Sequence, residues 1–78
     1  MSYQSYVRAV LNDFVDHPQD IKLTELAGEK SVIIELHCHP DDVGKVIGKN
    51  GKVISALRTL LGMVGSRNGV RATIEVVE

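Results

Sequence analysis

The sequence predicts an α+β domain with the element order α-β-β-α-α-β, in which three helices cover one face of a three-stranded mixed sheet. Three observations predict it. Apolar residues recur at helical spacing over residues 3–16, 43–47 and 53–64. They alternate with other residues over 31–38 and 70–77, which is the pattern of half-buried strands. The glycine tetrad GKNG then separates the second helical segment from the third.

The first helix is expected to run from residue 3 to about residue 16. Ser2 is a suitable N-cap, because its hydroxyl can accept a hydrogen bond from an N–H group of the first turn. The helix should end before Pro18, because the residue that precedes a proline avoids helical geometry. Its apolar face comprises Tyr3, Val7, Val10, Leu11 and Phe14.

Two strands joined by a short turn are expected next. Residues 20–26 alternate partly and residues 31–38 alternate well, with AGEK at 27–30 as the turn between them. So short a connection predicts an antiparallel hairpin. The apolar face of the second strand comprises Val32, Ile34, Leu36 and Cys38.

The helix that enters the glycine tetrad should begin at Pro40, which suits the first helical position. Asp41 and Asp42 would then lie in its first turn, where the helix dipole favours acidic side chains. The helix after the tetrad should fray or end early at Gly62 and Gly65, since each glycine costs about 1 kcal/mol relative to alanine.

A polar loop over residues 65–69 and a last strand over 70–77 are expected to complete the chain. The two helices between the second and third strands form a crossover connection, which allows those strands to be parallel. The sheet should therefore be mixed.

Composition indicates an ordinary globular domain. The chain has 78 residues, of which 44% are hydrophobic and 24% charged. It contains no apolar run long enough to span a membrane, its N-terminus lacks the build of a signal peptide, and its single cysteine has no internal partner. We expect one domain over residues 1–78 and a cytoplasmic location.

Charge is distributed unevenly along the chain. The net charge is −1, yet residues 43–74 hold six basic residues and no acidic one, so this segment is +6. The remainder holds three basic and ten acidic residues and is −7. Positive potential is thus concentrated around the glycine tetrad.

The tetrad Gly48–Gly51 is the strongest functional signal in the chain. Glycines allow a sharp turn and let a phosphate approach without meeting a Cβ atom. The following helix would point free N–H groups and the positive end of its dipole at that phosphate. A G-x-x-G turn between two helices also resembles the element with which KH domains clamp the backbone of about four nucleotides, which implies such a clamp here. The candidate RNA-binding residues are Lys45, Val46, Ile47, Gly48, Lys49, Asn50, Gly51, Lys52 and Ile54, with Val46, Ile47 and Ile54 as candidates for an apolar groove floor.

The segment PDDVGKVIGKNGKVISALRTLL, the strand SVIIELH and the terminal RATIEVVE together resemble a bacterial type II KH domain. The resemblance covers essentially the whole chain and is closest to the small single-domain proteins of the KhpA family. It implies a type II KH fold and a cytoplasmic RNA-binding protein that forms a homodimer. It also implies a larger, KhpB-like partner that carries its own KH domain. Some members act as RNA chaperones or post-transcriptional regulators linked to cell shape.

Two alternatives to RNA binding stay open at this stage. No residue pattern in the sequence indicates recognition of the ribose 2′-hydroxyl group, which distinguishes RNA from DNA, so the same turn could bind single-stranded DNA. The domain could also be a protein-interaction or dimerisation module with little nucleic-acid binding. Self-association is expected in either case, because the missing side chain of Gly62, beside Met63, would let another backbone approach, unless this glycine simply marks a fraying helix end.

Catalysis, cofactors and metals are not expected. His37 and His39 share one face of a strand while Cys38 points away, so His17 or Asp41 would have to complete any metal site. The glycines do not follow the spacing of a P-loop or a dinucleotide fingerprint. No paired carboxylates or nucleophile elbow are recognisable, so we expect no enzymatic activity.

Overall fold

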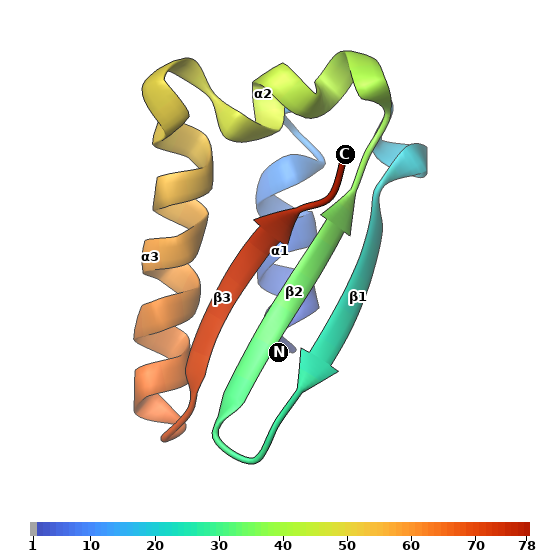
Figure 1. Cartoon of the computed structure of the whole chain (residues 1–78). Coiled ribbons are helices and arrows are strands. Elements are labelled where there is room, and N and C mark those ends of the chain that lie inside the picture. The colour runs from blue at the N-terminus through green and yellow to red at the C-terminus, as the bar shows by residue number, and fades with distance from the viewer. Residues whose placement is uncertain (1) are drawn as a thin grey trace.

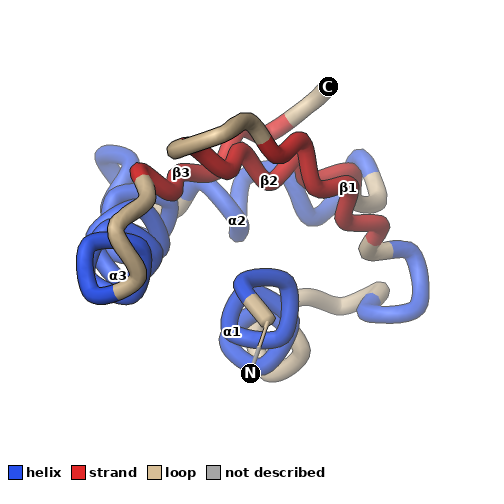
Figure 2. The backbone as a smooth tube through the Cα atoms, turned by 90° about the horizontal axis from the view of Figure 1, so that it is seen from below, coloured by secondary structure: helices blue, strands red, loops and turns tan. Residues whose placement is uncertain are grey.

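The sheet has the strand order β1-β2-β3 in the computed structural model, which describes residues 2–78 (Figure 1). β1 (Lys22–Ala27) is antiparallel to β2 (Ser31–His37), and β2 is parallel to β3 (Arg71–Val76). The helices lie on one side of this sheet, as Figure 2 shows from below. The predicted fold class, element order and mixed sheet are confirmed.

α1 (Tyr3–Leu11) begins as predicted but ends well before residue 16. Ser2 caps it, because its hydroxyl accepts a hydrogen bond from the N–H group of Ser5 at 3.2 Å. At the other end, the Leu11 carbonyl accepts hydrogen bonds from the N–H groups of Phe14 and Val15, at 2.9 and 3.1 Å. These two bonds close the helix with a turn.

The predicted continuation of α1 was wrong because a distant carboxylate binds the backbone beyond it. The N–H groups of Asp16 and His17 donate to the side chain of Asp42 rather than to helical carbonyls. A short 3₁₀ helix, Pro18–Asp20, then leads into β1. The contact between Asp42 and this segment spans more than twenty residues of sequence and lies beyond the reach of periodicity arguments.

The core lies between the sheet and the helices. Alternation along β2 and β3 buries one face of each strand, and the parallel register places Ile34 opposite Ile74. The largest fully buried apolar side chains come from α1, β2, α3 and β3 and are Leu11, Ile34, Leu36, Leu57, Leu61 and Ile74. The opposite sheet face is more polar, except for Leu26 and Ile33, which are 48% and 37% exposed.

Two helices flank the glycine tetrad. A 3₁₀ turn, Pro40–Asp42, leads into α2 (Val43–Ile47), with Pro40 at the start as predicted. A second 3₁₀ turn, Lys49–Gly51, leads into α3 (Lys52–Arg67). The tetrad therefore forms the corner between a short helix and the longest helix of the domain (Figure 1).

The expectation that α3 ends early was wrong, because the helix continues through both glycines to Arg67. Gly65 packs against β3: a Cβ atom there would lie 2.8 Å from the Val70 carbonyl oxygen and 3.0 Å from the Ala72 Cβ. The missing side chain thus permits close packing that offsets the low helix propensity of glycine. Within the described part of the chain, no helix has both the length and the apolar character needed to cross a bilayer.

Candidate nucleic-acid interface

Three residues of the tetrad adopt positive φ angles. Gly48, Asn50 and Gly51 have φ values of 80°, 58° and 72°, a region that glycine and asparagine tolerate best. The Gly51 N–H group donates to the Gly48 carbonyl at 3.0 Å, and the Gly48 N–H group donates to the Gly44 carbonyl at 2.8 Å. The backbone thereby reverses direction between α2 and α3 within four residues.

The two glycines of the tetrad serve different purposes. A Cβ atom on Gly48 would lie 2.8 Å from the backbone nitrogen of Val53, so the chain folds directly over the first turn of α3. A Cβ atom on Gly51 would meet nothing within 4 Å, so the outer side of the turn is open. Gly48 is therefore required for the fold of the turn, whereas Gly51 leaves its backbone accessible.

The first turn of α3 is an anion-binding position by its geometry. Gly51 is the N-cap residue and has no side chain with which to cap the helix. The first N–H groups of the helix consequently lack a side-chain acceptor from the N-cap, and the helix dipole favours a negative charge there. Lys49 and Lys52 flank this position and are both exposed.

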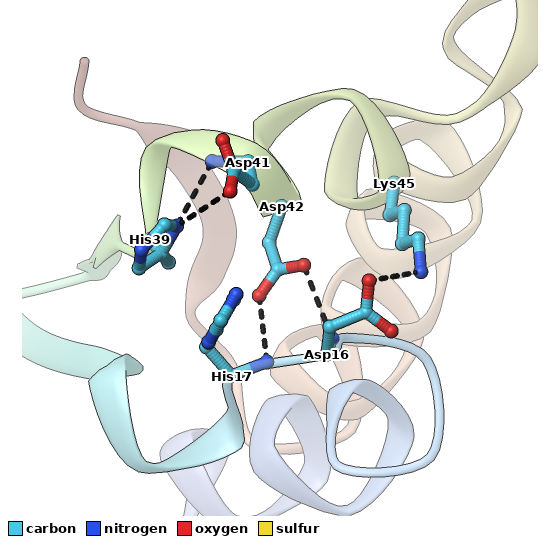
Figure 3. Close-up of polar contacts among 6 residues, drawn as sticks. All are labelled: Asp16, His17, His39, Asp41, Asp42 and Lys45. Atoms are coloured by element: carbon cyan, nitrogen blue, oxygen red, sulfur yellow. Dashed lines mark hydrogen bonds and ion pairs between the residues drawn. The ribbon is translucent and has the colours of Figure 1, made fainter.

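Lys45, the third predicted lysine, forms an intramolecular ion pair at the surface. Its Nζ donates to the Asp16 carboxylate at 2.8 Å, as Figure 3 shows. This hydrogen bond raises the pKa of Lys45 above its ordinary value, so the lysine stays charged. Because Asp16 compensates that charge, Lys49 and Lys52 are the lysines of the turn that are free of ion pairs among residues 2–78.

The apolar residues predicted for the groove floor differ in their accessibility. Val46 is fully buried and Ile54 is 6% exposed, and both belong to the hydrophobic core. Ile47 is only partly buried and packs against the core from outside. Val46 and Ile54 therefore support the turn from within, and Ile47 is the one of the three that a ligand could touch.

Asp42 was not recognised from the sequence as a structural residue of this region. Its side chain is fully buried and accepts hydrogen bonds from the N–H groups of Asp16 and His17, at 3.1 and 2.9 Å (Figure 3). Burial acts to raise the pKa of the Asp42 carboxyl, but these N–H groups and the charges of His17 and Lys45 outweigh it and lower the pKa. Asp42 thus ties the segment after α1 to the start of α2.

The prediction that His37 and His39 share one face of a strand was wrong, because β2 ends at His37 and His39 lies at the start of the following 3₁₀ turn. The rings of His17 and His39 stack with centroids 3.9 Å apart, and these residues with Asp41 offer possible ligand atoms within 4.8 Å of one another. His39 Nδ1 already accepts the Asp41 N–H at 3.1 Å, so a local turn accounts for this pair. Burial and the neighbouring Asp42 charge raise the pKa of Cys38, which disfavours the thiolate that binds metals.

A G-x-x-G turn that is open at Gly51 and joins two helices, in a domain with the element order αββααβ and a mixed three-stranded sheet, is characteristic of a KH domain. Comparison with known proteins agrees with this class. The KH-domain model described as KhpA/KhpB matches residues 4–76. The chain belongs to this KhpA/KhpB family of KH domains.

Three relatives illustrate the similarity, and each bears the name RNA-binding protein KhpA. That of Chlamydia pneumoniae is 39% identical over 75 residues, covering 96% of both chains. That of Aquifex aeolicus is 42% identical over 72 residues, covering 92% of this chain and 91% of the relative. That of Clostridium perfringens is 35% identical over 71 residues, covering 91% and 95%. The match therefore extends over nearly the full length of proteins named for RNA binding.

Proposed function

We propose that this protein is a non-enzymatic, cytoplasmic KH-domain protein that binds single-stranded RNA at the tetrad Gly48–Gly51. The observation that carries the proposal is the open outer side of Gly51 at the N-terminus of α3, between exposed Lys49 and Lys52. The names of the relatives support RNA as the ligand. A role as an RNA chaperone or post-transcriptional regulator is consistent with this mode of binding.

The geometry suggests how the site would work. The N–H group of Lys52 already donates to the Lys49 carbonyl, so a phosphate oxygen would accept hydrogen bonds from the next N–H groups of the first turn of α3, while Lys49 and Lys52 supply positive charge from either side. The chain has only three aromatic residues, Tyr3, Tyr6 and Phe14, and all of them lie on or just after α1. Bases would consequently rest on aliphatic surface such as Ile47 rather than stack on rings.

A double substitution, Lys49→Asp with Asn50→Asp, tests the site. It places two carboxylates where a phosphate should lie, so affinity for single-stranded RNA should fall more than tenfold, a loss above about 1.4 kcal/mol. The thermal midpoint should change by less than about 4 °C, because both side chains are exposed. Fluorescence anisotropy with a labelled oligonucleotide and a melting curve measure the two quantities.

A matched control makes the same change of charge elsewhere. Lys22→Asp with Asn12→Asp alters two exposed residues away from the tetrad and should leave RNA affinity nearly unchanged. Equal losses in the two double variants would refute a localised site. Competition between RNA and DNA of the same sequence decides the remaining alternative, since tighter DNA binding would make this a single-stranded DNA-binding protein.

We also propose that the protein forms a homodimer through the groove between α1 and α3. Val10 and Phe14 are 37% and 47% exposed, and with Leu60 they line an apolar hollow of about 280 Å³. A site for four nucleotides binds weakly alone, so two linked sites on one RNA would gain effective concentration. A KhpB-like protein that carries a KH domain is a second candidate partner for this groove, in keeping with the family description.

Sedimentation at micromolar concentration tests the dimer, since a single species of 8.5 kDa would contradict it. Phe14→Glu should dissociate a dimer formed through the α1–α3 groove. Gly62→Arg tests the other surface suggested by the sequence, because Gly62 lies on the side of α3 that borders β3. Dissociation by Gly62→Arg alone would move the interface to that surface.

A further inference from the structure

α3 presents a polar stripe to the free edge of β3. Arg58 Nε donates to the Ile74 carbonyl at 3.2 Å, and Arg58 Nη2 lies 3.8 Å from Glu75 Oε2. Gly62 and Ser66, four and eight residues further on, border the start of β3. Since these positions share one face of a helix, they form a seam along which α3 lies beside β3, and the start of α3 beyond this seam leads to the glycine tetrad (Figure 1).

The seam ends in an open hollow of about 670 Å³. Its walls come from the end of α3, the start of β3 and the turn between β1 and β2. Two cations, Lys30 and Arg71, and two hydroxyl groups, Ser31 and Ser66, line it, and the described lining residues include no carboxylate. The Arg71 N–H group donates to the Lys30 carbonyl at 2.9 Å, so the backbones that carry the two cations are held together.

Gly62 keeps this hollow open. A Cβ atom at Gly62 would meet nothing within 4 Å, although the residue lies in the middle of a helix where glycine is unfavourable. Close packing therefore does not explain this glycine, unlike Gly65 one turn later. What the missing side chain does provide is access to the floor of a hollow with basic walls.

We propose that this hollow is a second phosphate subsite for single-stranded RNA, reached by a strand that runs from the glycine tetrad along the α3–β3 seam. The inference rests on the proposed function and extends it from one end of α3 to the other. Fourteen residues separate Lys52 from Ser66, which is about 21 Å along a helix. Even at the stacked spacing of about 3.4 Å per nucleotide, about six nucleotides span that length.

Arg58 lies between the two ends of this path. Its side chain is 46% exposed and is fixed at the edge of β3 by Ile74 and Glu75. Its remaining N–H groups can donate to a base or a phosphate that passes along the seam. Because Glu75 compensates the charge of Arg58, the uncompensated positive charge of the path lies at its two ends, and Arg58 contributes hydrogen-bond donors between them.

The test compares RNAs of four and eight nucleotides with the full-length protein and with Lys30→Gln/Arg71→Gln. The affinity of the parent for the eight-nucleotide RNA should depend more steeply on salt than that of the variant. The slope of log K against log salt should differ by about 1.4, because the variant loses two phosphate contacts and each contact to a single strand contributes about 0.7. Between 50 and 200 mM salt, the affinity of the parent should thus fall about sevenfold more than that of the variant. The four-nucleotide RNA should bind both proteins nearly equally.

Arg8→Gln/Lys22→Gln is the matched control, because it removes the same charge from exposed positions outside the seam. Gly62→Glu is an independent variant, which fills the hollow with a carboxylate while improving helix propensity, and it should weaken only the longer RNA. An eight-nucleotide RNA that binds Lys30→Gln/Arg71→Gln, Gly62→Glu and the control alike would overturn the subsite.

The two proposals fail in distinguishable ways. If the parent binds neither RNA, the proposed function itself is wrong. If the parent binds both RNAs and Lys49→Asp/Asn50→Asp abolishes binding, but the hollow variants match the control, then only the second subsite is wrong.

Discussion

The same substitution at two glycines of α3 should have opposite effects on stability. In a helix interior, Gly→Ala stabilises by about 1 kcal/mol through helix propensity alone. At Gly62 the new methyl group enters open space, so Gly62→Ala should raise the free energy of unfolding by about that amount. At Gly65 the methyl group would lie 2.8 Å from the Val70 carbonyl oxygen, and 3.0 Å and 3.1 Å from the Cβ and backbone nitrogen of Ala72.

The contacts at Gly65 outweigh the gain in propensity. Two of the three atoms belong to backbone that is held in place, since the Val70 N–H group also donates to the Gly65 carbonyl at 2.9 Å. Overpacking of a well-packed site costs about 1–3 kcal/mol. Taking the upper part of that range for backbone contacts, Gly65→Ala should lower the free energy of unfolding by about 1–2 kcal/mol after the gain in propensity is subtracted.

Urea unfolding followed by circular dichroism measures both variants against the parent. For a domain of this size, 1 kcal/mol corresponds to a shift of about 4–8 °C in the thermal midpoint, so the two melting curves should lie on either side of the parent. The reasoning would be refuted if Gly65→Ala were as stable as Gly62→Ala. That result would mean that α3 does not approach β3 as closely as the structure describes.

Two further predictions concern charge. For a four-nucleotide RNA, the logarithm of the association constant should fall against the logarithm of the salt concentration with a slope of about −1.4, since two lysines are free of ion pairs. Asp16→Asn releases Lys45 and should steepen this slope to about −2.1. Binding titrations from 50 to 300 mM salt measure both slopes, and an unchanged slope in the variant would mean that Lys45 does not face the RNA. The pKa of Asp42 is lower in the folded protein than its ordinary value of 3.8. The ionised carboxylate therefore stabilises the fold at pH values above 3.8, and this contribution is lost as the pH falls through the lower pKa of the folded protein. In urea unfolding from pH 7 to pH 2.5, Asp42→Asn should therefore be less stable than the parent at pH 7, and the gap should close in acid; a constant gap would contradict the assignment.

Local sequence determined most of the secondary structure and the turn. Alternation along residues 31–38 predicted β2 and its buried face, because a strand repeats every two residues whatever it packs against. Ser2 and Pro40 marked helix starts because capping and the fixed φ angle of proline are properties of neighbouring residues. The tetrad Gly48–Gly51 predicted a sharp turn because the need for positive φ angles is likewise local.

The tertiary structure alone decided which side chains of the region are accessible and which charges are compensated. The path of the backbone at Asp16 and His17, after α1, and the pairing of Lys45 with Asp16 depend on partners 25 to 29 residues away along the chain. Val46 and Ile47 are equally apolar neighbours, yet only the first is fully buried. Gly62 and Gly65 looked alike in the sequence, but one borders an open hollow and the other packs against β3. Periodicity describes a residue's own helix or strand, whereas burial, ion pairing and cavities depend on the element that packs against it.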